Sequence, residues 1–249
     1  MEYTIVIPVY NESDKIANTI NQVITFMRTF SEKFEVIVVD DGSSDNTVQI
    51  LENLTSSYKE LVIIKNKHKG KSAAVWSGMY QAKGDYIYMC DADLATPIEE
   101  LKKLASWITE HNYDIVIASR EGAGAVRINE PLTRHLAGRI FNAWVQAFAL
   151  PGIKDSQCGF KLFRREPAKV IFSKLQVYGE NAPEINRPQF GAFDVEVLYL
   201  AKKFKYKVKE LPVIWKYVKT TRLNFFENTF RMSTDVLKVR INDLLGRYK

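Results

Sequence analysis

Four continuous apolar segments alternate with helical patterns, and this alternation constrains the fold of the chain more than any other feature. The segments are Tyr3–Val9, Phe34–Val39, Leu61–Ile64 and Tyr86–Cys90. Apolar positions at helical spacing follow the first segment over residues 14–30, and further helices are predicted near 46–56 and 72–82. Continuous apolar strands that alternate with helices are typical of a parallel sheet covered on both faces. We therefore predict an α/β fold with a mostly parallel sheet flanked by helices.

Polar clusters stand where the predicted strands end, which is where sheets of this kind bind their ligands. The fourth strand ends in Asp91-Ala92-Asp93, two carboxylates at positions i and i+2 that share one face. Beyond the strand end both can turn toward one hard divalent cation, Mg²⁺ or Mn²⁺, which is commonly also coordinated by substrate phosphates. The pattern therefore predicts a metal-held nucleotide diphosphate. Aspartates at strand ends also serve simply as turn or cap residues.

Composition places the chain among ordinary globular proteins. Its 249 residues, 46% of them hydrophobic, suit one large α/β domain, or such a domain with an extension. The two cysteines, Cys90 and Cys158, are too few for a disulfide framework and lack metal-ligand spacing, so we expect reduced thiols in a cytosolic compartment. We expect no signal peptide and no membrane span, because neither a basic leader nor about 18 consecutive apolar residues occur.

Positive charge is concentrated near the C-terminus. Residues 201–249 contain 13 Lys and Arg against 4 Asp and Glu, within a chain whose net charge is +6. Such asymmetry indicates an anionic partner: a phosphate-bearing substrate, a nucleic acid or an anionic membrane surface. Familiar phosphate loops are absent, because a P-loop ending at Gly70-Lys71-Ser72 would need a glycine where Lys65 stands.

Taken together, the motifs resemble those of family 2 inverting glycosyltransferases. The resemblance rests on Ile7-Pro8-Val9-Tyr10-Asn11-Glu12, Val38-Val39-Asp40-Asp41-Gly42-Ser43-Ser44-Asp45 and Asp91-Ala92-Asp93. Three later motifs are similar to the branch that makes dolichyl-phosphate glucose and dolichyl-phosphate mannose: Ala118-Ser119-Arg120, Asp155-Ser156-Gln157-Cys158-Gly159-Phe160 and Phe193-Asp194-Val195-Glu196. The resemblance implies a glycosyltransferase-A fold over residues 1–220, a nucleotide-sugar donor, Mg²⁺ or Mn²⁺, and a dolichyl or polyprenyl phosphate acceptor.

Roles follow from the resemblance residue by residue. It implies that the nucleotide sugar is bound by Pro8, Tyr10, Asn11, Glu12, Asp40, Lys71, Asp91, Ala92, Asp93 and Arg222. The metal ligands would be Asp91 and Asp93, and Ala95 stands where some relatives have a glutamine that completes the metal shell. The acceptor phosphate would be held by Ser119, Arg120 and Arg134. The catalytic residues would be Asp93, Asp155, Gln157 and Asp194.

Several of these residues also have a purely structural interpretation. Asn11 and Glu12 can cap the first helix, Arg134 and Arg139 can lie on the polar face of a helix, and Asp41 before a glycine is typical of a turn. For Asp40 we favour binding, and for Asp41 turn formation.

We expect an inverting, metal-dependent transfer of a hexose to a polyprenyl phosphate, and we favour glucose from UDP-glucose over mannose from GDP-mannose. Three alternatives remain open. A soluble glycosyltransferase with a hydroxyl acceptor would need a base, nominally Asp155 or Asp194. A nucleotidyltransferase would use the same acidic pair, and a basic binding module would explain only the C-terminus.

Residues 221–249 are predicted to form a basic amphipathic helical extension, and 136–150 a second amphipathic helix. We therefore expect peripheral binding to the cytoplasmic face of a membrane, directly or through a membrane-protein partner, and no nucleic-acid partner. The alternative is that these apolar faces pack on the sheet or in a homodimer.

Overall fold

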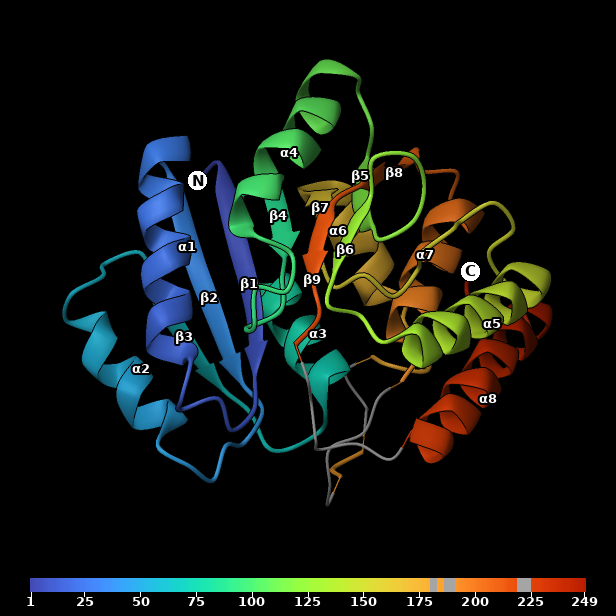
Figure 1. Cartoon of the computed structure of the whole chain (residues 1–249), viewed down its shortest axis with the longest axis horizontal. Helices are drawn as coiled ribbons and strands as arrows, with labels where there is room; N and C mark the ends of the chain where they lie inside the picture. Colours follow the sequence, from blue (N-terminus) through green and yellow to red (C-terminus); the bar gives the residue numbers. More distant parts are fainter. Residues whose placement is uncertain (180–182, 186–190, 219–224) are drawn as a thin grey trace.

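A seven-stranded sheet forms the centre of the molecule (Figure 1). The computed structural model describes residues 1–179, 183–185, 191–218 and 225–249. The main sheet contains β1 (Tyr3–Val9), β2 (Phe34–Asp40), β3 (Leu61–Lys65), β4 (Tyr86–Met89), β5 (Ile115–Ser119), β7 (Lys161–Arg164) and β8 (Val208–Pro212). Their order across the sheet is β3-β2-β1-β4-β7-β5-β8. The strands β6 (Val126–Ile128) and β9 (Ile214–Lys216) form a separate pair.

Strand β7 runs antiparallel to both of its neighbours, whereas every other pair in the sheet is parallel. The register places Lys161, at the start of β7, opposite Met89 at the end of β4 and Ile117 near the end of β5. The segment that leads into β7 therefore reaches the edge of the sheet where the parallel strands end. The predicted α/β class and mostly parallel sheet are confirmed.

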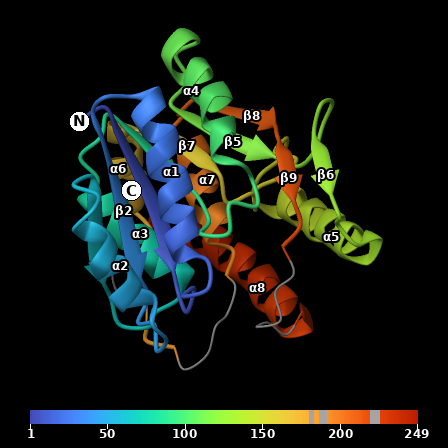
Figure 2. The same cartoon turned by 60° about the vertical axis from the view of Figure 1, so that its left-hand side comes forward.

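Helices cover both faces of the sheet (Figures 1 and 2). One core contains residues of α1 (Ile16–Phe30), α2 (Thr47–Thr55) and α4 (Leu101–Glu110), which the short helix η1 (Ile98–Glu100) precedes. The other core contains residues of α3 (Lys71–Gln81), α5 (Leu132–Phe148), α6 (Arg165–Ser173), α7 (Phe193–Lys203) and α8 (Phe225–Leu244). All residues of β1 and β2 are buried, as expected for strands with helices on both sides.

The C-terminal residues take part in the second core. Val236 and Val239 of α8 are fully buried, and so is Tyr248, whose hydroxyl donates a hydrogen bond of 2.7 Å to the buried Glu196 of α7. Helix α8 lies beside α5, as Figure 1 shows. Packing on the body of the protein therefore explains part of the apolar pattern of α8.

Candidate active site

The loops that follow β1 and β2 are joined to each other by hydrogen bonds. The backbone N–H of Asn11 donates to Ser43 Oγ at 2.8 Å, and Asn11 Oδ1 accepts the N–H of Ser44 at 2.8 Å. The N–H of Glu12 donates to Thr47 Oγ1 at 2.8 Å, at the start of α2. These contacts place Tyr10, Asn11 and Glu12 next to the end of β2, so the residues predicted to bind the donor do come together.

Asp40 ends β2 and is 2% exposed. Its Oδ2 accepts the N–H groups of Gly42 and Ser43, both at 3.0 Å, whereas its buried Oδ1 has no hydrogen-bond partner among the described residues. A buried acceptor without a donor costs about 1–3 kcal/mol. Asp40 therefore forms the turn with one oxygen, and its other oxygen is left without a donor within the described residues.

Asp41 was predicted from the sequence to form a turn, but it also binds the loop of residues 68–70. Its carboxylate accepts the N–H groups of Lys69 at 2.9 Å and Gly70 at 2.8 Å, and it contacts Nδ1 of His68 at 2.8 Å. Burial raises its pKa, against these interactions. The His68 ring in turn stacks on Tyr10, with centroids 4.1 Å apart. Asp41 therefore fixes the loop that precedes α3, and sequence reasoning missed both this function and His68.

The two aspartates after β4 lie beside Lys71, the first residue of α3. Lys71 Nζ is 2.5 Å from Asp91 Oδ1, and Asp93 Oδ1 accepts the N–H of Ala95 at 3.0 Å. Although burial opposes it, the charges of Asp91, Asp194 and Asp93 raise the pKa of Lys71. Loss of hydration around its carboxyl, and then the charge of Asp91, raise the pKa of Asp93, although the residue keeps an exposed surface. Ala92 is buried between them, where its carbonyl accepts the hydroxyl of Thr19.

These two carboxylates suit a metal that takes part of its shell from a substrate. Within the described parts of the chain no group of three or more His, Cys, Asp or Glu side chains gathers as a metal site. Mg²⁺-type sites with one or two carboxylates completed by substrate phosphates and water are common, and the oxygen donors here fit that type.

Gly159, in the segment before β7, lies directly against Asp91. A Cβ at residue 159 would come 2.1 Å from Asp91 Oδ2 and 2.9 Å from Oδ1. The antiparallel course of β7 produces this contact, because it brings Gly159 to the end of β4. The absence of a side chain at 159 thus leaves room for the Asp91 carboxylate.

We expect Gly159→Ala to lower kcat/KM for the sugar transfer predicted from the sequence about a hundredfold, because a displacement of about 1 Å in a site can have that effect. The added methyl must displace the Asp91 carboxylate, because a Cβ at residue 159 would lie less than 3.0 Å from both oxygens of this short side chain. Gly138→Ala in α5 is the matched control, because a Cβ there meets nothing within 4 Å. Steady-state kinetics of both variants test the prediction, and full activity of Gly159→Ala would contradict it.

Arg120 and Asp155 form a buried two-point ion pair. Arg120 Nε donates to Asp155 Oδ2 at 2.7 Å and its Nη2 to Oδ1 at 2.8 Å, with side chains 17% and 6% exposed. Although burial acts in the opposite direction, Arg120 lowers the pKa of Asp155 to about 2. Neighbouring Ser119 is fully buried, and its hydroxyl exchanges hydrogen bonds with the backbone of Glu121. Ser119 and Arg120, both predicted to bind the acceptor phosphate, thus form hydrogen bonds with other groups of the protein.

Asp194, at the start of α7, is paired with Lys161 of β7. Lys161 Nζ lies 2.5 Å from Asp194 Oδ1, also donates to the carbonyl of Cys158, and is 1% exposed. Asp194 is close enough to act on the charge of Lys71, so it belongs to the same cluster as Asp91. Lys161 was missed from the sequence, although a lysine between Phe160 and Leu162 in an apolar strand is a usable signal.

The remaining predicted residues are placed less centrally. Pro8 is buried within β1, opposite Val39. Gln157 is half-buried, and its N–H donates to Asp155 Oδ1 at 3.2 Å. The guanidinium of Arg134, in the first turn of α5, lies over the ring of Tyr217 at 5.2 Å. Arg222 lies outside the described residues.

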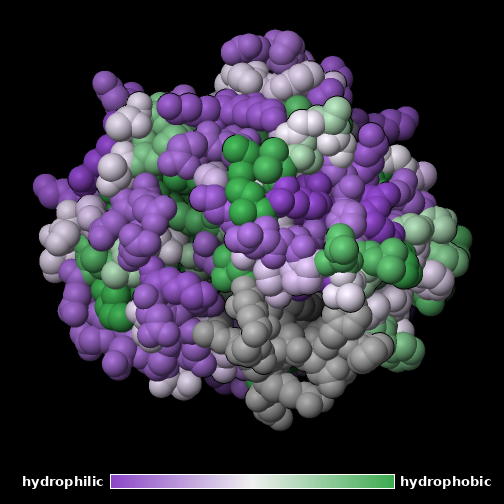
Figure 3. Space-filling model, in the orientation of Figure 1, coloured by the Kyte–Doolittle hydropathy of each residue, from purple (hydrophilic) through white to green (hydrophobic). Residues whose placement is uncertain are grey.

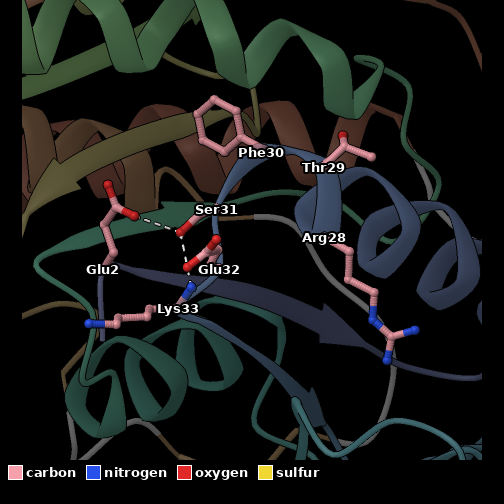
Figure 4. A pocket seen from close by; sticks show the side chains of 7 residues that line it. All are labelled: Glu2, Arg28, Thr29, Phe30, Ser31, Glu32 and Lys33. Carbon is pink, nitrogen blue, oxygen red and sulfur yellow. Dashed lines mark hydrogen bonds between the residues drawn. The ribbon is translucent and has the colours of Figure 1, made fainter.

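A hollow of about 550 Å³ at the other edge of the sheet is unrelated to this site (Figure 4). Its walls are Glu2 and residues 28–33, which stand at the amino ends of β1 and β2. Figure 4 shows Ser31 hydrogen-bonded to Glu2, while the side chain of Arg28 points away from both. The chemistry described above gathers at the carboxyl ends instead.

None of the helices in the described part of the chain is both long and apolar enough to cross a bilayer.

Comparison with known families and proteins shows what the chain is similar to. The family model described as Glycosyl transferase family 2 matches residues 4–172. The chain is 32% identical to the dolichyl-phosphate beta-glucosyltransferase of Dictyostelium discoideum, over 99% of this chain and 76% of that protein. It is 31% identical to the human dolichyl-phosphate beta-glucosyltransferase, over 100% of this chain and 78% of that protein.

Solved structures share the fold at lower sequence identity. Mannosyl-3-phosphoglycerate synthase from Rubrobacter xylanophilus matches with a TM-score of 0.65 and 18% identity, covering 99% of this chain and 75% of that one. Glucosyl-3-phosphoglycerate synthase from Mycobacterium tuberculosis, in complex with Mn²⁺ and uridine-diphosphate-glucose, matches with a TM-score of 0.62 and 18% identity, covering 99% and 79%.

Proposed function

The chain belongs to glycosyl transferase family 2, and from this premise we propose that it transfers glucose from UDP-glucose to dolichyl or another polyprenyl phosphate. The product would be a β-linked lipid phosphosugar formed by a single in-line displacement. The names of the relatives above support the lipid acceptor and the sugar. The donor pocket is supported by the buried, unpartnered oxygen of Asp40, which can accept a hydrogen bond from a base N–H or a ribose hydroxyl.

In this proposal Asp91 and Asp93 would hold Mg²⁺ or Mn²⁺ beside the donor diphosphate. The metal supplies Lewis-acid stabilisation of the charge that grows on the leaving nucleotide. Tyr10, whose ring is stacked on His68, would contact the base, and Lys71 would add positive charge beside the diphosphate. Asn11 and Glu12 keep the two donor-binding loops in register with each other.

The observation that carries the acceptor assignment is that both nominated bases are engaged by cations. Asp155 is held by Arg120 with a pKa of about 2, and Asp194 is held by Lys161. A hydroxyl acceptor would need a base of much higher pKa, near the working pH. A phosphate acceptor is already ionised near neutral pH, so positioning and stabilisation of the leaving group suffice. Arg134 is the candidate for gripping that phosphate, because it has no carboxylate partner within the described residues.

Product analysis tests this function. The purified protein would be incubated with a membrane lipid extract and radiolabelled UDP-glucose or GDP-mannose, with Mg²⁺ or Mn²⁺. We expect label from UDP-glucose to enter the organic phase, and chelation of the metal to abolish the transfer. Label that enters only from GDP-mannose would reverse the sugar assignment. Label that stays on a water-soluble acceptor would favour a hydroxyl-directed glycosyltransferase.

The proposal includes docking on an anionic membrane surface, because the acceptor keeps its tail in lipid. Exposed apolar side chains at helical spacing form a stripe on α5 and another on α8, the helix beside it. On α5 they are Leu132, Leu136 and Ile140, and on α8 they are Phe230, Leu237, Ile241 and Leu244. Figure 3 shows hydrophobic atoms toward the side of the molecule where α5 lies. Arg231 on α8 supplies charge that suits an anionic leaflet, and so does Lys238, although it also pairs with Asp235 at 2.8 Å.

We expect the protein to bind liposomes more strongly as their anionic lipid content rises, and less strongly as salt is added. Each Lys or Arg near such a leaflet contributes about 1 kcal/mol, and salt screens this attraction. Sedimentation with liposomes measures the binding, and Leu136→Glu with Ile140→Glu should abolish it. Equal sedimentation with neutral and anionic liposomes, or none with either at low salt, would contradict direct docking.

A further inference from the structure

The carboxylate of Asp91 is already occupied by a cation from the protein. Lys71 Nζ lies 2.5 Å from Oδ1, and the carboxylate rests against Gly159, where a Cβ would come 2.1 Å from Oδ2. Both side chains remain partly open to solvent, with 37% of Lys71 and 34% of Asp91 exposed. The Lys71 ammonium is therefore paired with the same carboxylate that we expect to bind the metal.

The backbone under Lys71 is held in place, whereas its side chain is long and partly exposed to solvent. Gly70 precedes it with φ of 92°, and the N–H of Gly70 is held by the buried Asp41 at 2.8 Å. Lysine carries its charge on a flexible four-carbon stem, so the ammonium can leave Asp91 without movement of α3. Within the protein, the neighbouring carboxylate of Asp194 is already paired with Lys161 and is therefore not an open partner for the Lys71 ammonium.

We propose that Lys71 couples metal binding to donor binding. Without a donor, its ammonium neutralises Asp91 and competes with the divalent cation. A bound diphosphate attracts the ammonium away from Asp91, and the carboxylate then becomes available to the metal. Metal and nucleotide diphosphate consequently strengthen each other's binding, and this coupling must be reciprocal. The inference rests on the metal and the nucleotide-sugar donor of the proposed function, but not on the acceptor.

The test measures Mn²⁺ binding by electron paramagnetic resonance of the free ion, with and without UDP. The variants are Lys71→Met, which removes the ammonium, and Lys71→Arg, which keeps a positive charge. We expect Lys71→Met to bind Mn²⁺ alone about fivefold or more tightly than wild type, the lower end of typical couplings. UDP should then strengthen Mn²⁺ binding by a smaller factor than in wild type. Lys71→Arg should remain close to wild type.

Lys67→Met is the matched control, because Lys67 lies on the same loop, is exposed, and pairs with Glu184 at 2.9 Å rather than with Asp91. It also removes one positive charge from the region, so any change in its Mn²⁺ binding measures the long-range electrostatic effect of that charge without the loss of the pair with Asp91. A general field effect would tighten Mn²⁺ binding in both variants and leave the enhancement by UDP intact. That result, or unchanged or weaker Mn²⁺ binding in Lys71→Met, would overturn the inference.

The outcomes separate this inference from the proposed function. If wild type binds Mn²⁺ and UDP but Lys71→Met behaves like wild type, only the coupling is wrong. If wild type binds no Mn²⁺ even with UDP, the metal-dependent function fails and the coupling fails with it. Thermal melting of Lys71→Met checks that the fold is retained.

Discussion

Replacing Arg120 with alanine should destabilise the protein by about 3–5 kcal/mol, because the change leaves the carboxylate of Asp155 buried without its cation. For a chain of 249 residues this corresponds to a fall in Tm on the order of 10 °C. In wild type the lowered pKa of Asp155, about 2, stabilises the fold above the pKa of the unfolded chain, and this stabilisation is lost as pH falls toward 2.

In the Arg120→Ala variant, the contribution of Asp155 to stability should change with pH in the opposite direction. Without Arg120, burial raises the pKa of Asp155 in the folded state, so that protonation favours the folded chain. The difference in stability between wild type and variant should therefore shrink as pH falls from 7 toward 4. Denaturant unfolding at several pH values measures it. A difference that is constant over this range would show that the buried charge is not the cause.

Two controls sharpen this test. Arg120→Ala combined with Asp155→Asn removes the buried charge and should recover part of the lost stability. Arg28→Ala breaks an ion pair of the same two-point geometry with Glu60, at 2.9 and 3.1 Å, but on the surface, where half of the Arg28 side chain is exposed. It should leave the Tm nearly unchanged.

The second large effect concerns chemistry rather than stability. Asp93→Asn should reduce turnover at least about a hundredfold, because loss of a metal ligand removes several kcal/mol of transition-state stabilisation. The fold should persist, since Asp93 is exposed and asparagine can still accept the N–H of Ala95. Turnover measured across a wide range of Mg²⁺ and Mn²⁺ concentrations, together with circular dichroism, checks both parts.

Asp85→Asn is the appropriate control for this change. Asp85 precedes the same strand at its amino end, is exposed, and pairs with Arg165 at 3.0 Å. Its replacement should leave turnover unchanged. If Asp93→Asn reached near-normal turnover at saturating Mg²⁺, the assignment of the metal to Asp91 and Asp93 would be wrong.

The exposed stripes on α5 and α8 show where amphipathic patterns have two meanings. Val236 and Val239 pack into the core, whereas Phe230, Leu237 and Ile241 of the same helix stay exposed. The sequence predicts that the segment is amphipathic. However, the helix carries apolar residues on two faces, and only the packed structure shows which of these faces is buried against the rest of the protein. The same holds for α5, which buries Val145 and exposes Leu136.

Sequence alone determined the class of the fold and the edge of the sheet that carries the chemistry. Continuous apolar strands and intervening helical periods dictate parallel β-α units, and in such units the carboxyl ends of β1, β2 and β4 meet. Asp40, Asp91 and Asp93 could thus be placed near one another from the order of the residues, because local pattern and chain direction suffice.

Only the tertiary structure decided how those carboxylates are partnered. A strand has the same two-residue period whether it pairs in parallel or antiparallel fashion, so the direction of β7 is not written in its pattern. Its antiparallel insertion between β4 and β5 sets Gly159 against Asp91 and brings Lys161 to Asp194. The loop before β7 pairs Asp155 with Arg120. These contacts join residues 33 to 68 positions apart, where no local period operates, and long-range packing alone selects them.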